Sequence, residues 1–157
     1  MSFPATHPYP CPPPELAVII PTYREADSVA EVARRVAHVL AGIHWELIFV
    51  DDDSPDGTAD RVRELAREDP RIRLIQRIGR RGLSSACIEG MLATAAPFMA
   101  VMDGDLQHDE TLLPRMLATI KAEDLDIAVG SRYVDGGGLG DWSARRRSMS
   151  RLATRIG

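Results

Sequence analysis

The chain has 157 residues, of which 45% are hydrophobic and 27% charged, and its formal net charge is −4. This length and composition are typical of one globular domain with a substantial core, and they exclude a chain that is disordered throughout. The mild acidity does not favour nucleic acid as a partner, and no apolar run approaches the ~18 residues of a membrane span. Cys11 and Cys87 supply neither a disulfide framework nor zinc-site spacing, which favours a reduced, cytoplasmic setting.

The first 14 residues differ in composition from the rest of the chain. They hold six of the eleven prolines, which predicts an extended, flexible leader over residues 1–14. The segment has neither the basic nor the apolar region of a secretory signal. At the other end, residues 135–157 finish in a helix-like pattern with no cap and no closing strand. We therefore expect one folded domain over residues 15–157 that is truncated at its C-terminus.

From residue 15 onward, short apolar runs alternate with amphipathic stretches. The apolar runs predict strands over residues 16–20, 47–50, 72–75, 98–102 and 127–129. The amphipathic stretches predict helices over residues 29–40, 58–68, 84–94 and 113–120. Ser28 and Glu31 have the spacing of a capping box, and Thr58 is placed to cap the second helix. The alternation predicts an α/β fold with a mostly parallel sheet and helices on both faces.

Polar side chains gather directly after the predicted strands, where open parallel sheets bind their ligands. These clusters are Tyr23–Glu25, Asp51–Ser54, Asp103–His108 and Ser131–Tyr133. A fold by itself requires no acids at such positions. The three carboxylates at 51–53 also repel one another unless a cation or hydrogen-bond donors face them. We therefore expect a binding site at this edge of the sheet.

The spacing Asp103-x-Asp105-x-Gln107 favours a divalent cation. If the backbone stays extended here, all three side chains point to one side and present oxygen ligands to one ion. Such ligands suit Mg²⁺ or Mn²⁺, which complete their coordination with substrate phosphates. The competing interpretation is a solvated acidic loop, and the acids after the other strands favour the metal site. His108 is more typical of a surface histidine than of a further ligand.

Six motifs occur in a specific order along the chain. They are Pro21-Thr22-Tyr23-x-Glu25, Asp51-Asp52-x-Ser54-x-Asp56-Gly57-Thr58, Arg81-Gly82-Leu83-x-x-Ala86, Asp103-x-Asp105-Leu106-Gln107-His108, Val129-Gly130-Ser131-Arg132-Tyr133 and Trp142-x-x-x-Arg146. Together they closely resemble the polyprenyl (dolichyl) phosphate mannosyltransferases, which are inverting family 2 glycosyltransferases of GT-A fold. The sequence departs from that pattern at Arg24, Ser84 and Gly104, where the family has Asn, a frequent Gly, and Ala.

The resemblance implies a role for each matching position. The nucleotide pocket would be lined by Pro21, Tyr23 and Glu25, with Val50 and Asp52 at the base. The ribose and diphosphate would face Asp103, Gly104 and Asp105. Metal ligands would be Asp105 and Gln107, with Asp103 beside them. The phosphates would be held by Arg132 and Arg146, which with Asp105 form the implied catalytic set.

The implied reaction is transfer of mannose from GDP-mannose to a polyprenyl phosphate on the cytoplasmic face of a membrane. A longer parent protein would contact the membrane surface through C-terminal parts that this sequence lacks. The acceptor phosphate is already anionic at neutral pH, so no general base is needed. Two alternatives stay open: UDP-glucose or another nucleotide sugar as donor, and a non-catalytic nucleotide-binding fragment.

A receiver-like signalling domain is disfavoured by the positions of the acids. Such a domain needs acids after its first and third strands and a lysine after its fifth. Here the acids follow the second and fourth predicted strands, and Arg132 follows the fifth.

Overall fold

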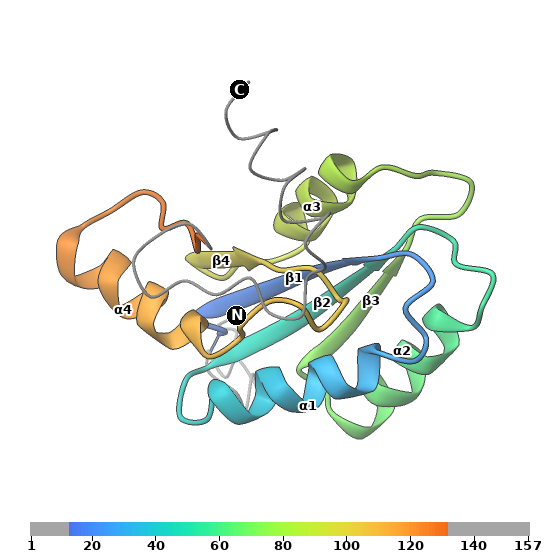
Figure 1. The fold of residues 1–157 in the computed structure, drawn as a ribbon, viewed down its shortest axis with the longest axis horizontal. Helices are drawn as coiled ribbons and strands as arrows, with labels where there is room; N and C mark the ends of the chain where they lie inside the picture. The colour runs from blue at the N-terminus through green and yellow to red at the C-terminus, as the bar shows by residue number, and fades with distance from the viewer. Residues whose placement is uncertain (1–12, 132–157) are drawn as a thin grey trace, which may run out of the picture. The chain divides into compact units, whose positions relative to one another are not determined.

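A computed structural model describes residues 13–131 of the chain (Figure 1). Residues 1–12 of the predicted 1–14 leader, the segment 135–157, Arg132 and Arg146 lie outside the described residues, so the predictions made for them stay predictions. The chain divides into two compact units, with the boundary after Leu117. The sheet and the site residues up to Gln107 belong to the first unit.

Four parallel strands form the sheet in the order β3-β2-β1-β4 (Figure 1). Their bounds are β1 Leu16–Thr22, β2 Trp45–Asp51, β3 Ile72–Gln76 and β4 Phe98–Val101. In the ladders, Leu16 pairs with Trp45 on one side and with Phe98 on the other. The central strands β1 and β2 are buried almost throughout, as their continuous apolar sequences predict for strands covered on both faces.

Four helices connect or follow the strands: α1 Val29–Val39, α2 Thr58–Glu68, α3 Leu83–Leu92 and α4 Leu112–Glu123. Helices α1 and α2 cover one face of the sheet, and α3 lies on the other (Figure 1). The predicted α/β fold with helices on both faces is therefore confirmed. None of the helices in the described residues is long and apolar enough to cross a bilayer.

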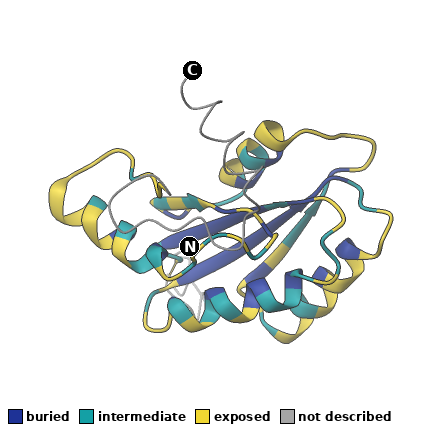
Figure 2. Cartoon of the chain, viewed as in Figure 1, coloured by how far each residue is buried: buried dark blue, intermediate teal, exposed yellow. Residues whose placement is uncertain are grey.

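Two apolar clusters hold these layers together, and they use alternate residues of β1 and β2. One cluster joins the α1 and α2 side of the sheet to the start of α4, and its members include Val18, Ile20, Leu47, Phe49, Val36 and Leu117. The other lies under α3 and contains Ala17, Ile19, Ile48, Val50, Ala86 and Ala96. Figure 2 shows this burial along the central strands, with the exposed residues on the outer helical faces. Each fully buried aliphatic side chain contributes about 1.5–3 kcal/mol.

The helix starts differ from the sequence prediction. Ser28 precedes α1 but makes no side-chain cap; its Oγ donates instead to Glu25 O and Glu25 Oε2. Glu31 is held by Arg34 and Arg35, so the predicted capping box is wrong. Thr58 does not cap α2 either, because it is the first helical residue after Gly57. In both cases the hydroxyl bonds instead to a carboxylate just upstream in the same loop, Glu25 for Ser28 and Asp56 for Thr58.

The fifth predicted strand is wrong as far as the described residues extend. Residues 127–131 adopt no regular structure, and the side chains of Ile127 and Val129 are exposed. Three apolar residues are a short run, and a strand forms only where a neighbouring strand completes its backbone hydrogen bonds. Helix α3 also ends at Leu92 rather than at the predicted Thr94.

Candidate functional site

The carboxyl ends of the four strands meet at one edge of the sheet, and the loops that follow them carry the predicted site residues. Three of these loops contain a non-glycine residue with positive φ: Arg24 at 62°, Asp53 at 56° and Leu106 at 61°. Left-handed backbone at residues other than glycine is costly and concentrates at functional sites. The loop that contains Arg24 is therefore not extended.

Asp51, the first of the three adjacent acids, serves the fold. It is fully buried and accepts hydrogen bonds from Ser54 N at 2.9 Å, Ser54 Oγ at 2.5 Å and Thr22 Oγ1 at 3.4 Å. These donors compensate the buried carboxylate and shape the loop after β2. The expectation that the fold requires no acid here is wrong for Asp51.

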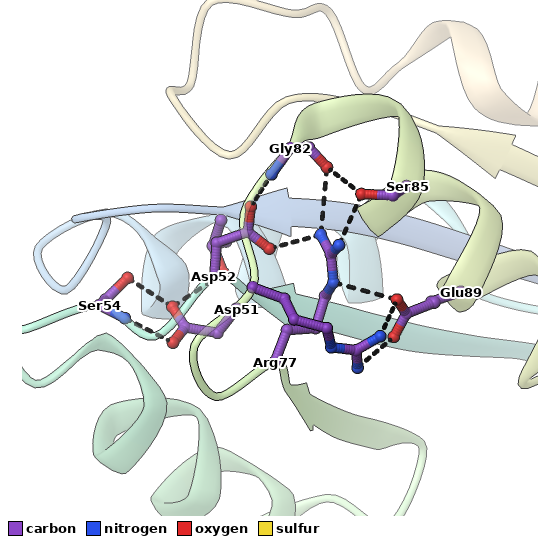
Figure 3. Close-up of polar contacts among 9 residues, drawn as sticks. Asp51, Asp52, Ser54, Arg77, Gly82, Ser85 and Glu89 are labelled. Carbon is purple, nitrogen blue, oxygen red and sulfur yellow. Dashed lines mark hydrogen bonds and ion pairs between the residues drawn. The ribbon is translucent and has the colours of Figure 1, made fainter.

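Asp52, the second acid, faces a cation, as the repulsion argument predicts. Its Oδ1 accepts Arg77 Nη1 at 2.6 Å, and its Oδ2 accepts the backbone N–H of Gly82 at 2.6 Å (Figure 3). Asp53, the third acid, points elsewhere and accepts longer bonds from Gln76 Nε2 and Gly79 N, both at 3.4 Å. The three carboxylates thus avoid mutual repulsion by having separate sets of donors.

Tyr23 directly follows β1 in the loop beside Asp52. The backbone N–H of Asp52 donates to Thr22 O at 3.0 Å, which places Asp52 beside the end of β1. The Tyr23 side chain is half-exposed, and the guanidinium of Arg81 lies 4.5 Å from its ring centroid. An aromatic face next to a carboxylate can stack on a planar base and accept its N–H groups.

Glu25 and Gly104 bring the loops after β1 and β4 together. A Cβ on Gly104 would lie 3.2 Å from Ile20 Cγ2 and 3.9 Å from Glu25 Cγ. The Glu25 carboxylate accepts Ser28 Oγ at 2.8 Å, and its backbone N–H donates to Thr58 Oγ1 at 3.0 Å. The Tyr23–Glu25 loop after β1 and the Asp103–Gln107 loop after β4 therefore lie against each other.

The Asp103–His108 loop is not extended. The predicted metal site assumed an extended backbone that points Asp103, Asp105 and Gln107 to one side, and this assumption is wrong. The backbone turns at Leu106, Asp105 Oδ1 accepts the Gln107 N–H at 3.0 Å, and Asp103 N donates to His108 Nδ1 at 3.1 Å. His108 thus has a structural partner within the loop. Asp103, Asp105 and Gln107 share one exposed loop through this turn.

The oxygen chemistry of this loop fits a hard divalent cation bound together with a ligand. Within residues 13–131, no group of three or more His, Cys, Asp or Glu side chains could hold an ion by itself. Exposed carboxylates at Asp103 and Asp105 instead match the arrangement in which one or two carboxylates bind the ion and phosphates complete its shell.

Two other predicted residues of the nucleotide pocket occupy the sheet itself. Pro21 is half-buried near the end of β1 and pairs in register with Val50. Val50 is fully buried, and its side chain packs beneath α3. Arg132 and Arg146 are beyond the described residues.

Sequence reasoning missed Arg77, Ser85 and Glu89. Arg77 is buried; its Nη1 also donates to Gly82 O at 3.1 Å, and its Nη2 donates to Ser85 Oγ at 2.5 Å. A signal was present: the repulsion among three acids required a cation, and Arg77 comes two residues after the third apolar run. Nothing in the spacing identified which of several nearby arginines would be the buried one.

Comparison with known sequences decides the family. Residues 17–156 match the family model for glycosyl transferase family 2. The chain belongs to this family. The predicted resemblance to family 2 glycosyltransferases is thereby confirmed.

Curated relatives of this family 2 chain carry closely related names. It is 40% identical over 143 residues to a dolichol-phosphate mannosyltransferase of Pyrococcus furiosus, covering 91% of this chain and 40% of the relative. It is 38% identical to a polyprenol monophosphomannose synthase of Mycolicibacterium smegmatis, covering 87% and 52%. It is 35% identical to a dolichol-phosphate mannosyltransferase of Saccharomyces cerevisiae, covering 88% and 53%. The chain therefore spans roughly half or less of these relatives.

Solved structures support the same fold. A mannosyltransferase from Pyrobaculum calidifontis, solved in complex with GDP-Man and Mn²⁺, is 25% identical with a TM-score of 0.60, over 73% of this chain and 36% of that one. TarS of S. aureus, at 19% identity and a TM-score of 0.60 over 75% and 39%, shows the shared fold alone. The sheet and its helices are those of a GT-A glycosyltransferase.

Proposed function

We propose that this chain is the nucleotide-sugar-binding part of a metal-dependent, inverting transferase that moves mannose from GDP-mannose to a polyprenyl phosphate. The observation that carries the proposal is the convergence of Tyr23, Asp52 and the Asp103–Gln107 loop at one edge of a GT-A sheet. The names of the curated relatives and the GDP-Man in the Pyrobaculum structure support the choice of sugar and nucleotide.

In this proposal the base lies against Tyr23 with its polar edge at Asp52. Glu25 and Pro21 line the pocket, and the buried Val50 supports its floor from β2. Asp103, Gly104 and Asp105 face the ribose and diphosphate. The closeness of Gly104 to Glu25 supports this assignment, because it brings the β4 loop to the wall of the base pocket.

A divalent ion, Mg²⁺ or Mn²⁺, would be held by Asp105 and Gln107 with Asp103 beside it. When bound, such an ion stabilises the charge of a departing nucleoside diphosphate. The Asp103 and Asp105 side chains are exposed, so both remain accessible to an ion that arrives with the donor. The Mn²⁺ in the Pyrobaculum structure supports a divalent ion, and the choice between the two metals belongs to the proposal.

The acceptor in this proposal is a lipid phosphate monoester. Its second pKa is ~6, so at neutral pH it is largely the dianion and attacks the anomeric carbon without a general base. Arg132 and Arg146 hold the phosphates and, together with positioning by the pocket, replace base catalysis. Attack from the side opposite the departing diphosphate inverts the anomeric configuration. A lipid acceptor implies reaction at a membrane, and we propose the cytoplasmic face for the parent protein.

Two alternatives make different predictions. A UDP-sugar donor keeps the mechanism but changes the base that Asp52 contacts. A non-catalytic fragment binds nucleotide without turnover; the coverage of the relatives, between 40% and 53% of their length, is the observation that favours it.

The first test is the thermal shift of the 157-residue chain with GDP, UDP, GDP-mannose and UDP-glucose, each with Mn²⁺ or with EDTA. A ligand at ~100 times its Kd adds ~2.7 kcal/mol of stability, which is readily measured. The proposal predicts a shift with the guanine nucleotides that depends on the metal. Shifts confined to the uracil nucleotides would mean that the donor is a UDP-sugar rather than GDP-mannose. The absence of any shift would contradict the assigned site.

The second test is turnover with GDP-mannose and a polyprenyl phosphate, followed as lipid-linked mannose. A β-linked product from an α-linked donor supports the inverting transferase. Metal-dependent GDP-mannose binding without product supports the non-catalytic fragment instead.

A further inference from the structure

Arg77 is almost fully buried at the carboxyl edge of the sheet, between Asp52 and helix α3 (Figure 3). We propose that Arg77, held in turn by Glu89, is a positioning residue that fixes both oxygens of Asp52 toward the nucleotide base and thereby sets the preference for guanine over uracil. This inference rests on the proposed function, because it assigns Asp52 to the base.

The geometry around Asp52 supports a fixed acceptor. Arg77 Nη1 holds Oδ1 and Gly82 N holds Oδ2, each at 2.6 Å. Arg77 comes from the end of β3 and Gly82 from the start of α3, so two segments set the orientation of one carboxylate. The side chain of Asp52 is only 10% exposed.

A carboxylate held in this way still has acceptor capacity. Each of its oxygens carries two lone-pair sites, and one site per oxygen is used by Arg77 or Gly82. Guanine presents two adjacent N–H donors on its Watson–Crick edge, N1–H and N2–H, whereas uracil presents the single N3–H. A carboxylate with both oxygens fixed matches the paired donors of guanine and leaves one oxygen without a ligand donor when uracil binds.

Glu89 and Arg80 extend this arrangement onto α3. Glu89 Oε1 forms an ion pair with Arg77 at 3.2 Å from Nε, although the buried Nε–H donates no hydrogen bond, and Arg80 donates to both Glu89 oxygens at 2.7 Å and 2.9 Å. The Arg77 guanidinium therefore has a partner on each side: Asp52 toward the site and Glu89 toward the helix. Rotation of Arg77 would break contacts on both sides, which keeps the direction of its Nη1 donor constant.

Burying the Arg77–Asp52 ion pair costs desolvation free energy, so a gain in stability does not by itself explain why the pair is buried. A buried pair is often no more stabilising than well-packed apolar side chains of the same volume. Removing Arg77 leaves the largely buried Asp52 carboxylate without its cation. The carboxylate is then less firmly fixed in one orientation. A purely structural role predicts lower stability with unchanged base preference, whereas a positioning role predicts a change in base preference.

The test uses the 157-residue chain and titration calorimetry in Mn²⁺, with GDP, UDP and inorganic pyrophosphate as probes. The variants are Arg77→Met, which removes the cation, Arg77→Lys, which keeps the charge without the fork, and Glu89→Gln, which weakens the outer partner. Gly82→Ala tests the second donor, because Gly82 has φ +136° and an alanine there would displace its N–H. Arg61→Gln, which breaks an exposed ion pair with Glu64 on α2, is the matched control.

We expect Arg77→Met to weaken GDP binding about tenfold or more while pyrophosphate binding stays unchanged. The ratio of GDP to UDP affinity falls toward one, Arg77→Lys recovers part of it, and Glu89→Gln and Gly82→Ala shift it in the same direction by less. Arg61→Gln binds all three probes like the wild type. If Arg77→Met does not fold, the other three variants carry the test.

The inference is overturned if the wild type binds GDP and the folded variants keep its GDP-to-UDP ratio, or lose GDP and pyrophosphate by the same factor. A wild-type chain that binds neither GDP nor pyrophosphate with Mn²⁺ overturns the proposed function itself. The wild-type titration therefore separates the two failures.

Discussion

The backbone N–H of Glu25 donates to the side-chain oxygen of Thr58 at 3.0 Å, across 33 residues of sequence. The same hydroxyl donates to Asp56 Oδ1 at 2.6 Å, and Asp56 Oδ2 accepts the backbone N–H of Ala26 at 3.3 Å. The fully buried Thr58 thus joins the loop after β1 to the start of α2. The position of Glu25 at the candidate site depends on this link.

Replacing Thr58 by valine removes the hydroxyl at nearly constant volume. The Glu25 N–H and Asp56 Oδ1 then each lose a partner, so we expect the free energy of unfolding to fall by about 1–3 kcal/mol. Urea denaturation measures the loss. Thr58→Ser, which keeps the oxygen, is the control and should lose clearly less; equal losses for the two variants would mean that packing rather than hydrogen bonding dominates at this position.

Gly90→Ala is expected to push α3 away from the sheet. A Cβ on Gly90 would lie 3.1 Å from Val50 Cγ2 and closer still to Ile19 Cγ2, and both neighbours are fully buried. Overpacking of this kind costs about 1–3 kcal/mol, which exceeds the gain in helix propensity. Chemical denaturation compares it with Ser84→Ala on the exposed side of the same helix, which should be near neutral. Wild-type stability of the Gly90 variant would contradict the tight packing of α3.

Arg24→Asn is expected to stabilise the protein. Arg24 has φ 62°, a left-handed conformation that asparagine adopts more readily than arginine. Relief of this strain should add about 0.5–1 kcal/mol, because the Arg24 backbone bond to Ser54 Oγ at 2.9 Å remains. The melting temperature should rise by about 1–4 °C. A fall would show that the contact of the Arg24 guanidinium with the Tyr23 ring, 5.3 Å from the centroid, outweighs the strain.

Glu31 gives a pH-dependent prediction. Hydrogen bonds from Arg34 and then Arg35, both at 2.7 Å, lower the pKa of Glu31 from its ordinary 4.5 to about 2. Because the folded-state pKa is the lower one, this contribution to stability is complete above pH 4.5 and is lost as the pH falls toward 2. The Glu31 carboxyl carbon should titrate by NMR near pH 2. The Arg34→Gln, Arg35→Gln double variant should move its midpoint toward 4.5, and an unchanged midpoint would contradict the assigned cause.

The fold could be predicted from the sequence because its signals are local. Continuous apolar runs such as Leu47–Val50 identify buried strands, and the spacing from Val29 to Val36 identifies the inner face of a helix. The run at 127–129 shows the limit of this argument. Whether three apolar residues form a strand depends on a partner strand, and no local pattern reports one.

The site could be predicted in its location but only partly in its contacts. Parallel strands bring their carboxyl ends together, so Tyr23, Asp52 and Asp103 could be placed at one edge from the sequence. Which hydroxyl bonds to which carboxylate could not, because Ser28 and Thr58 have several acceptors within reach once the loops fold. The roles of Asp51 and Arg77 likewise arise from tertiary burial.

The most direct test of the central claim is calorimetric titration of GDP-mannose into the 157-residue chain, with Mn²⁺ and with EDTA, for the wild type and Asp105→Asn. The substitution preserves the shape of the side chain, and its amide oxygen can still accept the Gln107 N–H. The account predicts saturable one-to-one binding that EDTA abolishes and that Asp105→Asn weakens about tenfold or more in Mn²⁺. Equal affinity in Mn²⁺ and EDTA, or wild-type affinity for the variant, would contradict a metal-dependent nucleotide-sugar site at this edge of the sheet.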